Sequence, residues 1–178
     1  MTSHSGTPAK LQYPSGSAII AAIKQAGVEF VVSVPDIVTS DGLLWPISTD
    51  PELRLVRVCK EDEGVSICGA MSYNKTRALL LMQQTGLMDS LNAIRAIGMD
   101  YQLPICMMVG LQGKEAELKP ADSASYGVRI IEPILHAMDI PSRLIETPED
   151  VACISGDIEQ AYRSSTTLCF LIGRSPTP

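Results

Sequence analysis

Three adjacent carboxylates, Glu61, Asp62 and Glu63, open an apolar stretch that reads EDEGVSICGAMSY. A carboxyl group carried into an apolar pocket can hold or move a proton, which is the chemistry of general acids and bases. Acidic residues also favour the positive end of a helix dipole, so the cluster fits a solvated helix start equally well. Gly64 and the small residues after it allow this helix to approach another backbone or a flat ligand closely. Which interpretation holds depends on how the surrounding helices and strands position the carboxylates.

The motifs of several common enzyme classes are absent. There is no G-x-G-x-x-G, and the run Gly110–Lys114 has the wrong spacing for a P-loop. There is no G-x-S-x-G, and His4 and His136 give no convincing base for a Ser or Cys nucleophile. The five cysteines include no C-x-x-C pair, so buried free thiols explain them better than zinc or disulfides.

Composition restricts the partners and the compartment. The 178 residues are 46% hydrophobic and 19% charged, which is typical of one globular domain. A net charge of −6, with no long cluster of Lys or Arg, argues against binding to nucleic acid or anionic lipid. No apolar run is long enough to span a membrane, and the polar N-terminus does not resemble a secretory signal. We therefore expect a cytoplasmic protein with a flexible tail over residues 1–12.

Short apolar strands alternate with helical patterns along the chain. The strands are continuous apolar runs, which is typical of a parallel sheet buried on both faces. The fold class that this predicts is α/β, a parallel sheet of about six strands with helices on both faces. The long polar interval 111–126 is a candidate lid or interface loop. Strands are predicted at 28–34, 53–59, 78–82, 105–109, 142–145 and 167–172, and helices at 15–25, 61–74, 86–97, 128–137 and 148–164, with a short one from 40.

Parallel sheets bind ligands at the carboxyl ends of their strands, so the turns after the strands are the place to look for a site. Four such turns read SVPDIV, CKEDEGV, MQQTGLMDS and VGLQGKEAE. Asp36 and Gln84 are candidates for the reactive end of a site here, although each could equally have a plain turn-forming or capping role.

Four stretches in register resemble a known family. EDEGVSICGAMSY, MQQTGLMDSLNAI, LPICMMVGLQG and IIEPILHAMDIPSRLIE are similar to the pyrimidine-binding domain of thiamine-diphosphate enzymes, and most similar to phosphonopyruvate and sulfopyruvate decarboxylases. VVSVPDIVTSDGLL also resembles the first active-site loop of those enzymes. The resemblance covers about residues 15–172, and it implies a thiamine-diphosphate-binding fold with a pyrimidine-binding domain at 13–178.

The resemblance also implies roles for individual residues. Glu63 becomes the catalytic carboxyl that hydrogen-bonds the pyrimidine ring, because the spacing to Tyr73 fits it alone; Glu61 and Asp62 are then its solvated neighbours. The contacts to the cofactor implied by the resemblance come from Glu63, Pro35, Gln84, Thr85 and Gly86.

The substrate contacts are expected near a departure from the family pattern. The family tends to have Gly-Leu-Gly-Asn where this chain has Gly-Leu-Met-Asp, ending at Met88 and Asp89. Both residues and Asp36 are therefore predicted to face the substrate. Arg95, Lys114 and Arg129 could meet an anionic tail, but exposed surface charges are the alternative for each.

The chain resembles half an enzyme. The family holds the cofactor's diphosphate and Mg²⁺ with a Gly-Asp-Gly motif and a later Asn-Asn, whereas this chain has only Gly156, Asp157 and Ile158. The resemblance thus implies an alpha subunit, without a metal site of its own, whose beta subunit supplies the diphosphate and Mg²⁺ site. The implied reaction is decarboxylation of a 3-substituted 2-oxo acid such as sulfopyruvate, releasing CO₂ and an aldehyde. One alternative is a different substrate, such as phosphonopyruvate. Another is a carboligase reaction, and a third is a non-catalytic regulatory module that binds the cofactor.

Overall fold

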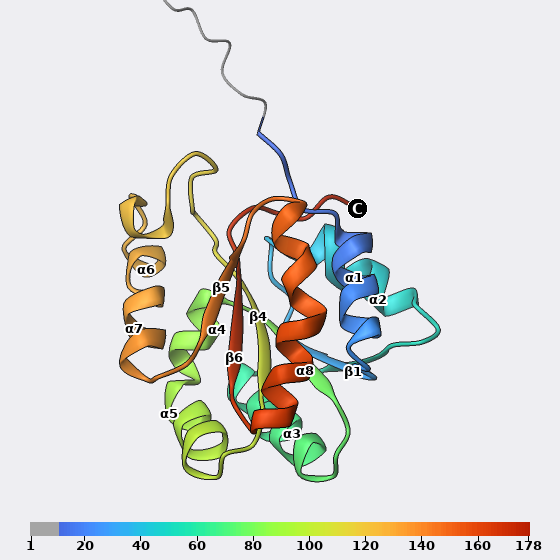
Figure 1. The fold of residues 1–178 in the computed structure, drawn as a ribbon. Coiled ribbons are helices and arrows are strands. Elements are labelled where there is room, and N and C mark those ends of the chain that lie inside the picture. Colours follow the sequence, from blue (N-terminus) through green and yellow to red (C-terminus); the bar gives the residue numbers. More distant parts are fainter. Residues whose placement is uncertain (1–10) are drawn as a thin grey trace, which may run out of the picture.

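A six-stranded parallel sheet forms the centre of the protein in a computed structural model that describes residues 11–178 (Figure 1). The strand order is β2-β1-β3-β4-β6-β5, and every neighbouring pair is parallel. The predicted fold class is confirmed. The strands are β1 (Phe30–Ser33), β2 (Arg54–Arg57), β3 (Ala78–Gln83), β4 (Cys106–Gly110), β5 (Ser142–Ile145) and β6 (Leu168–Ile172).

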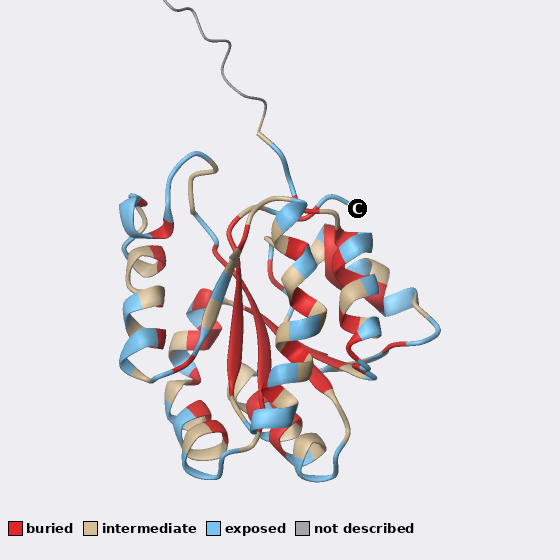
Figure 2. Cartoon of the chain, viewed as in Figure 1, coloured by how far each residue is buried: buried red, intermediate tan, exposed pale blue. Residues whose placement is uncertain are grey.

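The inner strands are buried on both faces, as their continuous apolar sequences predict. Every residue of β4 and β6 is buried, and β3 is buried up to its last residue (Figure 2). The edge strands β2 and β5 are only partly covered.

Two layers of helices cover the sheet, and each has its own hydrophobic cluster. Alternate residues of β3 serve the two layers: Leu79 and Leu81 pack into one cluster, Leu80 and Met82 into the other. One layer contains α1 (Gly16–Gln25), η1 (Ser40–Leu44), α2 (Trp45–Thr49), η4 (Glu149–Cys153) and α8 (Ile154–Ser164). The other contains α3 (Glu61–Tyr73), α4 (Gln84–Asp89), α5 (Leu91–Ala93), η2 (Ile94–Asp100), α6 (Tyr126–Arg129) and α7 (Ile131–Ala137).

The helix boundaries differ from prediction where the sequence periodicity is interrupted. Helix α1 begins one residue later than predicted, after Ser15, whose hydroxyl accepts a hydrogen bond from Ala18 N. The helix predicted over 86–97 instead starts at Gln84 and is divided at Ser90, whose N–H bonds the Gly86 and Leu87 carbonyls at the end of α4. The long interval 111–126 carries a short 3-10 turn, η3 (Pro120–Asp122).

The C-terminal segment is tied to the start of α1. Gly16 N donates to Thr177 O at 2.7 Å, and Thr177 N donates to Pro14 O at 2.9 Å. A Cβ atom on Gly16 would collide with the Gly42 carbonyl, so a glycine is required for this approach. The predicted tail lies outside the described residues except for Leu11 and Gln12.

All five cysteines are free, as predicted. Three of them, Cys68, Cys106 and Cys169, are buried, and burial raises the pKa of each thiol. Cys153 is half-buried and Cys59, just after β2, is exposed, so the expectation of burial does not hold for those two.

Candidate active site

The candidate residues lie along one edge of the sheet, because parallel strands all end on the same side. The turns after β1, β2, β3 and β4 begin at Val34, Val58, Gln84 and Leu111 respectively. Since β1 lies between β2 and β3, and β3 pairs with β4, these turns are neighbours in space as well.

Glu63 lies in the first turn of α3 and is exposed. Its Oε2 accepts hydrogen bonds from Cys59 N at 3.0 Å and Lys60 N at 3.3 Å, which is the arrangement of a capping box. Gly64 follows it and lets α3 press onto the sheet, since a Cβ there would come within 2.6 Å of Leu80 Cδ1. The carboxylate is therefore held at the sheet edge with its other oxygen, Oε1, free of hydrogen bonds from residues 11–178.

Glu61 is less solvated than expected. Its side chain is half-buried and lies against Gly86 in α4, where a Cβ atom would collide with the Glu61 carboxylate. A side chain at position 86 would displace the Glu61 carboxylate from its place against α4. Glu61 is thus a packing neighbour of a predicted cofactor contact.

Lys60 links the start of α3 to the end of α4. Its ammonium lies 3.3 Å from the Asp89 carboxylate and 3.8 Å from that of Asp62. The hydrogen bond to Asp89, with the charge of Asp62, raises the pKa of Lys60. Asp89, one of the predicted substrate contacts, is exposed and paired with this cation.

Met88 and Asp36, the other two predicted substrate contacts, are both engaged within the fold. Met88 is half-buried, and its terminal methyl lies 3.7 Å from the position of a Cβ on Gly127 in α6. Asp36 is 5% exposed, and its Oδ1 accepts from Val38 N at 2.7 Å and Thr39 N at 3.1 Å. The Thr39 hydroxyl donates to the other oxygen, so Asp36 caps the turn that leads into η1.

The predicted cofactor contacts differ in exposure. Pro35 and Thr85 are exposed, whereas Gly86 is buried beneath Glu61. Gln84 is 4% exposed, and its side-chain amide bonds the backbone of Gln112, after β4, through both of its polar atoms. Gln112 was not among the predicted site residues; its place directly after a buried strand was the signal that could have found it.

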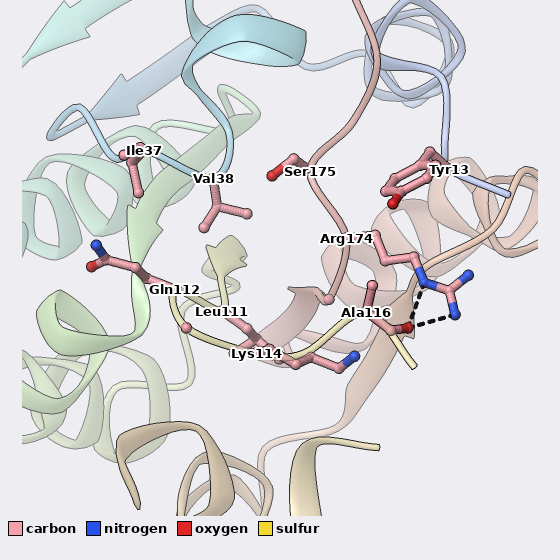
Figure 3. Close-up of a pocket in the computed structure, with 11 residues that line it drawn as sticks. Tyr13, Ile37, Val38, Leu111, Gln112, Lys114, Ala116, Arg174 and Ser175 are labelled. Atoms are coloured by element: carbon pink, nitrogen blue, oxygen red, sulfur yellow. Dashed lines mark hydrogen bonds between the residues drawn. The ribbon is translucent and has the colours of Figure 1, made fainter. Parts of the chain in front are cut away.

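A hollow of about 280 Å³ opens at the same edge, between the turns after β1, β4 and β6 (Figure 3). Lys114 was expected to be an exposed charge, but its side chain is fully buried and its ammonium pairs with Glu146. Arg174 donates to the Ala116 carbonyl through Nε at 3.0 Å and Nη2 at 2.9 Å. The hollow is lined by Tyr13, Ile37, Val38, Leu111, Gln112, Gly113, Lys114, Ala116, Gly173, Arg174 and Ser175.

Within residues 11–178, no group of three His, Cys, Asp or Glu side chains is placed to hold a metal ion. No helix in the same part of the chain is long and apolar enough to cross a membrane.

Comparison with known proteins identifies relatives along nearly the whole chain. The sulfopyruvate decarboxylase subunit alpha of Methanothermobacter thermautotrophicus is 32% identical over 164 residues, covering 91% of this chain and 97% of the relative. The protein of the same name from Methanococcus maripaludis is 29% identical over 137 residues, covering 76% and 80%. No family model matches the chain.

Among solved structures, the fold is similar to that of a 2-oxoglutarate:ferredoxin oxidoreductase from Magnetococcus marinus, determined with 2-oxoglutarate, coenzyme A and succinyl-CoA bound. The TM-score is 0.64 at 16% identity, and the match covers 96% of this chain. The chain spans 32% of that longer protein, so the likeness concerns one part of it and shows the fold alone.

Proposed function

Because the chain belongs to the family of sulfopyruvate decarboxylase alpha subunits, we propose that it is the alpha subunit of a two-subunit, thiamine-diphosphate-dependent decarboxylase. Its substrate is a 3-substituted 2-oxo acid such as sulfopyruvate, and its products are CO₂ and an aldehyde. The observation that carries the proposal is similarity over 97% of a relative bearing that name. The proposed compartment is the cytoplasm, which suits a chain with five free thiols.

Glu63 is the proposed catalytic residue. Thiamine diphosphate, when bound, supplies an electron sink for the cleavage of the carbon–carbon bond. Glu63 holds a proton at a ring nitrogen of the pyrimidine through Oε1, while the two backbone N–H groups keep Oε2 in place. A partner that covers this exposed carboxyl excludes water from it and strengthens its hydrogen bonds to the ring.

The donor set at this edge suits the pyrimidine half of the cofactor. Thr85 follows β3 and Pro35 follows the neighbouring β1, and both are exposed, while the buried Gly86 gives room to the Glu61 carboxylate beside them. At Gln84 we propose that the backbone, rather than the buried amide, contacts the cofactor.

The diphosphate and Mg²⁺ are assigned to the beta subunit. The described residues of this chain offer no cluster of metal ligands, and Mg²⁺ bound to a diphosphate needs carboxylate or amide oxygens. The cofactor then lies between the two subunits, with Glu63 facing the partner.

Met88 and Asp89 remain the proposed substrate neighbours on this chain. Asp89 is exposed at the end of α4, and its charge is balanced by Lys60. Asp36 is committed to its turn, so its proposed influence on the substrate is through the shape of that turn.

The proposal is tested with Glu63→Gln in the chain assembled with its beta subunit. The amide keeps the size of the side chain but cannot exchange the proton, so we expect release of CO₂ from sulfopyruvate to fall by about 10²–10⁴-fold. Folding and assembly should be unchanged. Glu61→Gln is the matched control and should stay within a few-fold of the wild type.

Full activity of Glu63→Gln would refute the assignment of Glu63. Analysis of the products separates decarboxylation, which releases a free aldehyde, from ligation of two carbonyl compounds. Turnover of phosphonopyruvate in preference to sulfopyruvate would revise the substrate, and absence of turnover with either would favour a regulatory module.

A further inference from the structure

The amide of Gln84 continues the sheet beyond the point where its backbone leaves it. Strands β3 and β4 pair from Leu79 with Cys106 to Gln83 with Gly110, and then α4 begins. From there the Gln84 side chain takes over: Nε2 donates to Gln112 O at 2.9 Å, and Oε1 accepts from Gln112 N at 2.8 Å.

The turn after β4 is consequently held from two sides. Leu111 N donates to Ile172 O of β6 at 3.0 Å, while Gln112 is bonded to Gln84. Gln84 is 4% exposed, so its amide faces the protein and is out of reach of a ligand. The effect of this side-chain amide on a bound molecule must therefore pass through Gln112.

The side chain of Gln112 has the opposite character. It is exposed and makes no hydrogen bond with any residue between 11 and 178. In Figure 3 it extends away from Lys114 and Arg174, on the side of the hollow where Ile37 lies. A fixed backbone with a free amide at a strand's carboxyl end is well suited to recognise a ligand.

The neighbouring cations are already engaged. The Lys114 side chain is buried and pairs with Glu146, and the guanidinium of Arg174 donates hydrogen bonds to backbone carbonyls. Arg129, the other basic candidate near the long loop, donates to the carbonyls of Ser123 and Ala124. Arg129 uses only Nη1 and does not line the hollow. Of Gln112, Lys114 and Arg174, which do line it, only the Gln112 side chain makes no hydrogen bond within residues 11–178.

We propose that Gln112 recognises the substrate, donating from its NH₂ to an oxygen of the anionic group that C3 of the 2-oxo acid carries, and that Gln84 is its positioning residue. The inference rests on the proposed function, since it names the part of that substrate that this chain recognises. It requires neither residue to take part in the chemistry at C2.

The first test is Gln112→Ala in the complex with the beta subunit. The probe is the 2-hydroxy analogue of sulfopyruvate, which cannot lose CO₂, and its Kd is measured by calorimetry. Loss of a hydrogen bond to a charged group should raise this Kd, and the KM for sulfopyruvate, about tenfold. The KM for pyruvate, which lacks the anion on C3, and the Kd of thiamine diphosphate should not change. Gln160→Ala, at an exposed position of α8, is the surface control.

The second test is Gln84→Met, which preserves the shape of the side chain and removes both hydrogen bonds. Amide hydrogen exchange at Gln112 should accelerate, and the Kd of the analogue should rise as in Gln112→Ala. The double variant should be no weaker than Gln112→Ala, because both changes remove the same contact.

A Kd for the analogue within twofold of wild type in Gln112→Ala overturns the proposal, as does a wild-type complex that does not bind the analogue. A Gln84→Met variant with weakened binding of thiamine diphosphate and unaltered binding of the analogue would make the Gln84 side chain a cofactor contact instead of a positioning group for Gln112. Analogue binding that depends on Gln112, in a complex that releases no CO₂, supports this inference and refutes the proposed reaction.

Discussion

Glu61, Asp62 and Glu63 are equivalent in the sequence, but each has a different environment in the structure. Asp62 Oδ1 accepts a hydrogen bond from Glu63 N at 2.9 Å. The Glu63 carboxylate accepts from the backbone just before α3, and the Glu61 side chain packs against α4. Spacing could single out Glu63 only through the resemblance to a family. The packing of Glu61 was not predictable, because it depends on where α4 starts.

Gly86→Ala should destabilise the protein, because the added methyl group takes the space of the half-buried Glu61 carboxylate and forces that side chain out of its packed position. We expect a loss of about 1–3 kcal/mol in the free energy of unfolding, measured by urea denaturation. Gly156→Ala is the matched control: a Cβ there has no neighbour within 4 Å, and Gly156 lies inside α8. It should stabilise by about 0.5–1 kcal/mol. Equal effects of the two changes would contradict the close approach.

Tyr162 connects helix α8 to the centre of the sheet. Tyr162 OH donates to Ala78 O at 3.0 Å and accepts from Ala78 N at 2.8 Å, at the start of β3. The Arg77 guanidinium lies 5.3 Å from the centre of its ring. Burial, with a smaller contribution from Cys106, raises the pKa of Tyr162 from 10.0 to about 12.

This shift makes the contribution of Tyr162 depend on pH in a defined direction. Because the pKa is higher in the folded state, the stability it represents is present below pH 10 and is lost as pH rises towards 12. Tyr162→Phe should cost about 1–2 kcal/mol at pH 8. The difference from wild type should shrink between pH 10 and 11.5 in urea denaturation. Tyr73→Phe, at an exposed position, should show no such trend, and a constant difference for Tyr162→Phe would argue against the shift.

The strands were predictable from the sequence because burial on both faces leaves a continuous apolar run, as in Ala78–Gln83 and Leu168–Ile172. The helices were less so. The pattern over 86–97 reads as one helix, yet Ser90 ends α4, and the chain continues as α5 and η2. No local sequence pattern indicates the hydrogen bonds between the Gln84 side chain and the Gln112 backbone, because the two residues are 28 positions apart.

At the scale of the whole molecule, Arg174 joins three distant segments. Besides Ala116 in the long loop, it donates to Gln12 O at 2.9 Å, and Glu146 Oε2 lies 4.0 Å away. None of these contacts has a local signal in the sequence. They anchor the polar interval 111–126, predicted as a lid or interface loop, beside Gln12 and the segment after β6.

Arg174→Ala should therefore loosen all three segments together. We expect a loss of about 1–3 kcal/mol, because the half-buried Ala116 carbonyl and Glu146 carboxylate lose the Arg174 guanidinium. Amide hydrogen exchange should accelerate around residues 12–16 and 114–118. Arg163→Ala, on the exposed face of α8, should stay within about 0.5 kcal/mol. Faster exchange confined to one segment would show that Arg174 does not couple them.

The exposure of Cys59 has a practical consequence for studying the assembled enzyme. The three buried thiols are protected from alkylation until the protein unfolds, whereas Cys59 is open to solvent and its own N–H holds the Glu63 carboxylate. An alkylating reagent followed by mass spectrometry therefore reports on the immediate surroundings of Glu63 without any mutation. Protection of Cys59 on mixing with the beta subunit, while Cys153 continues to react, would map the contact between subunits to the edge where β2 ends.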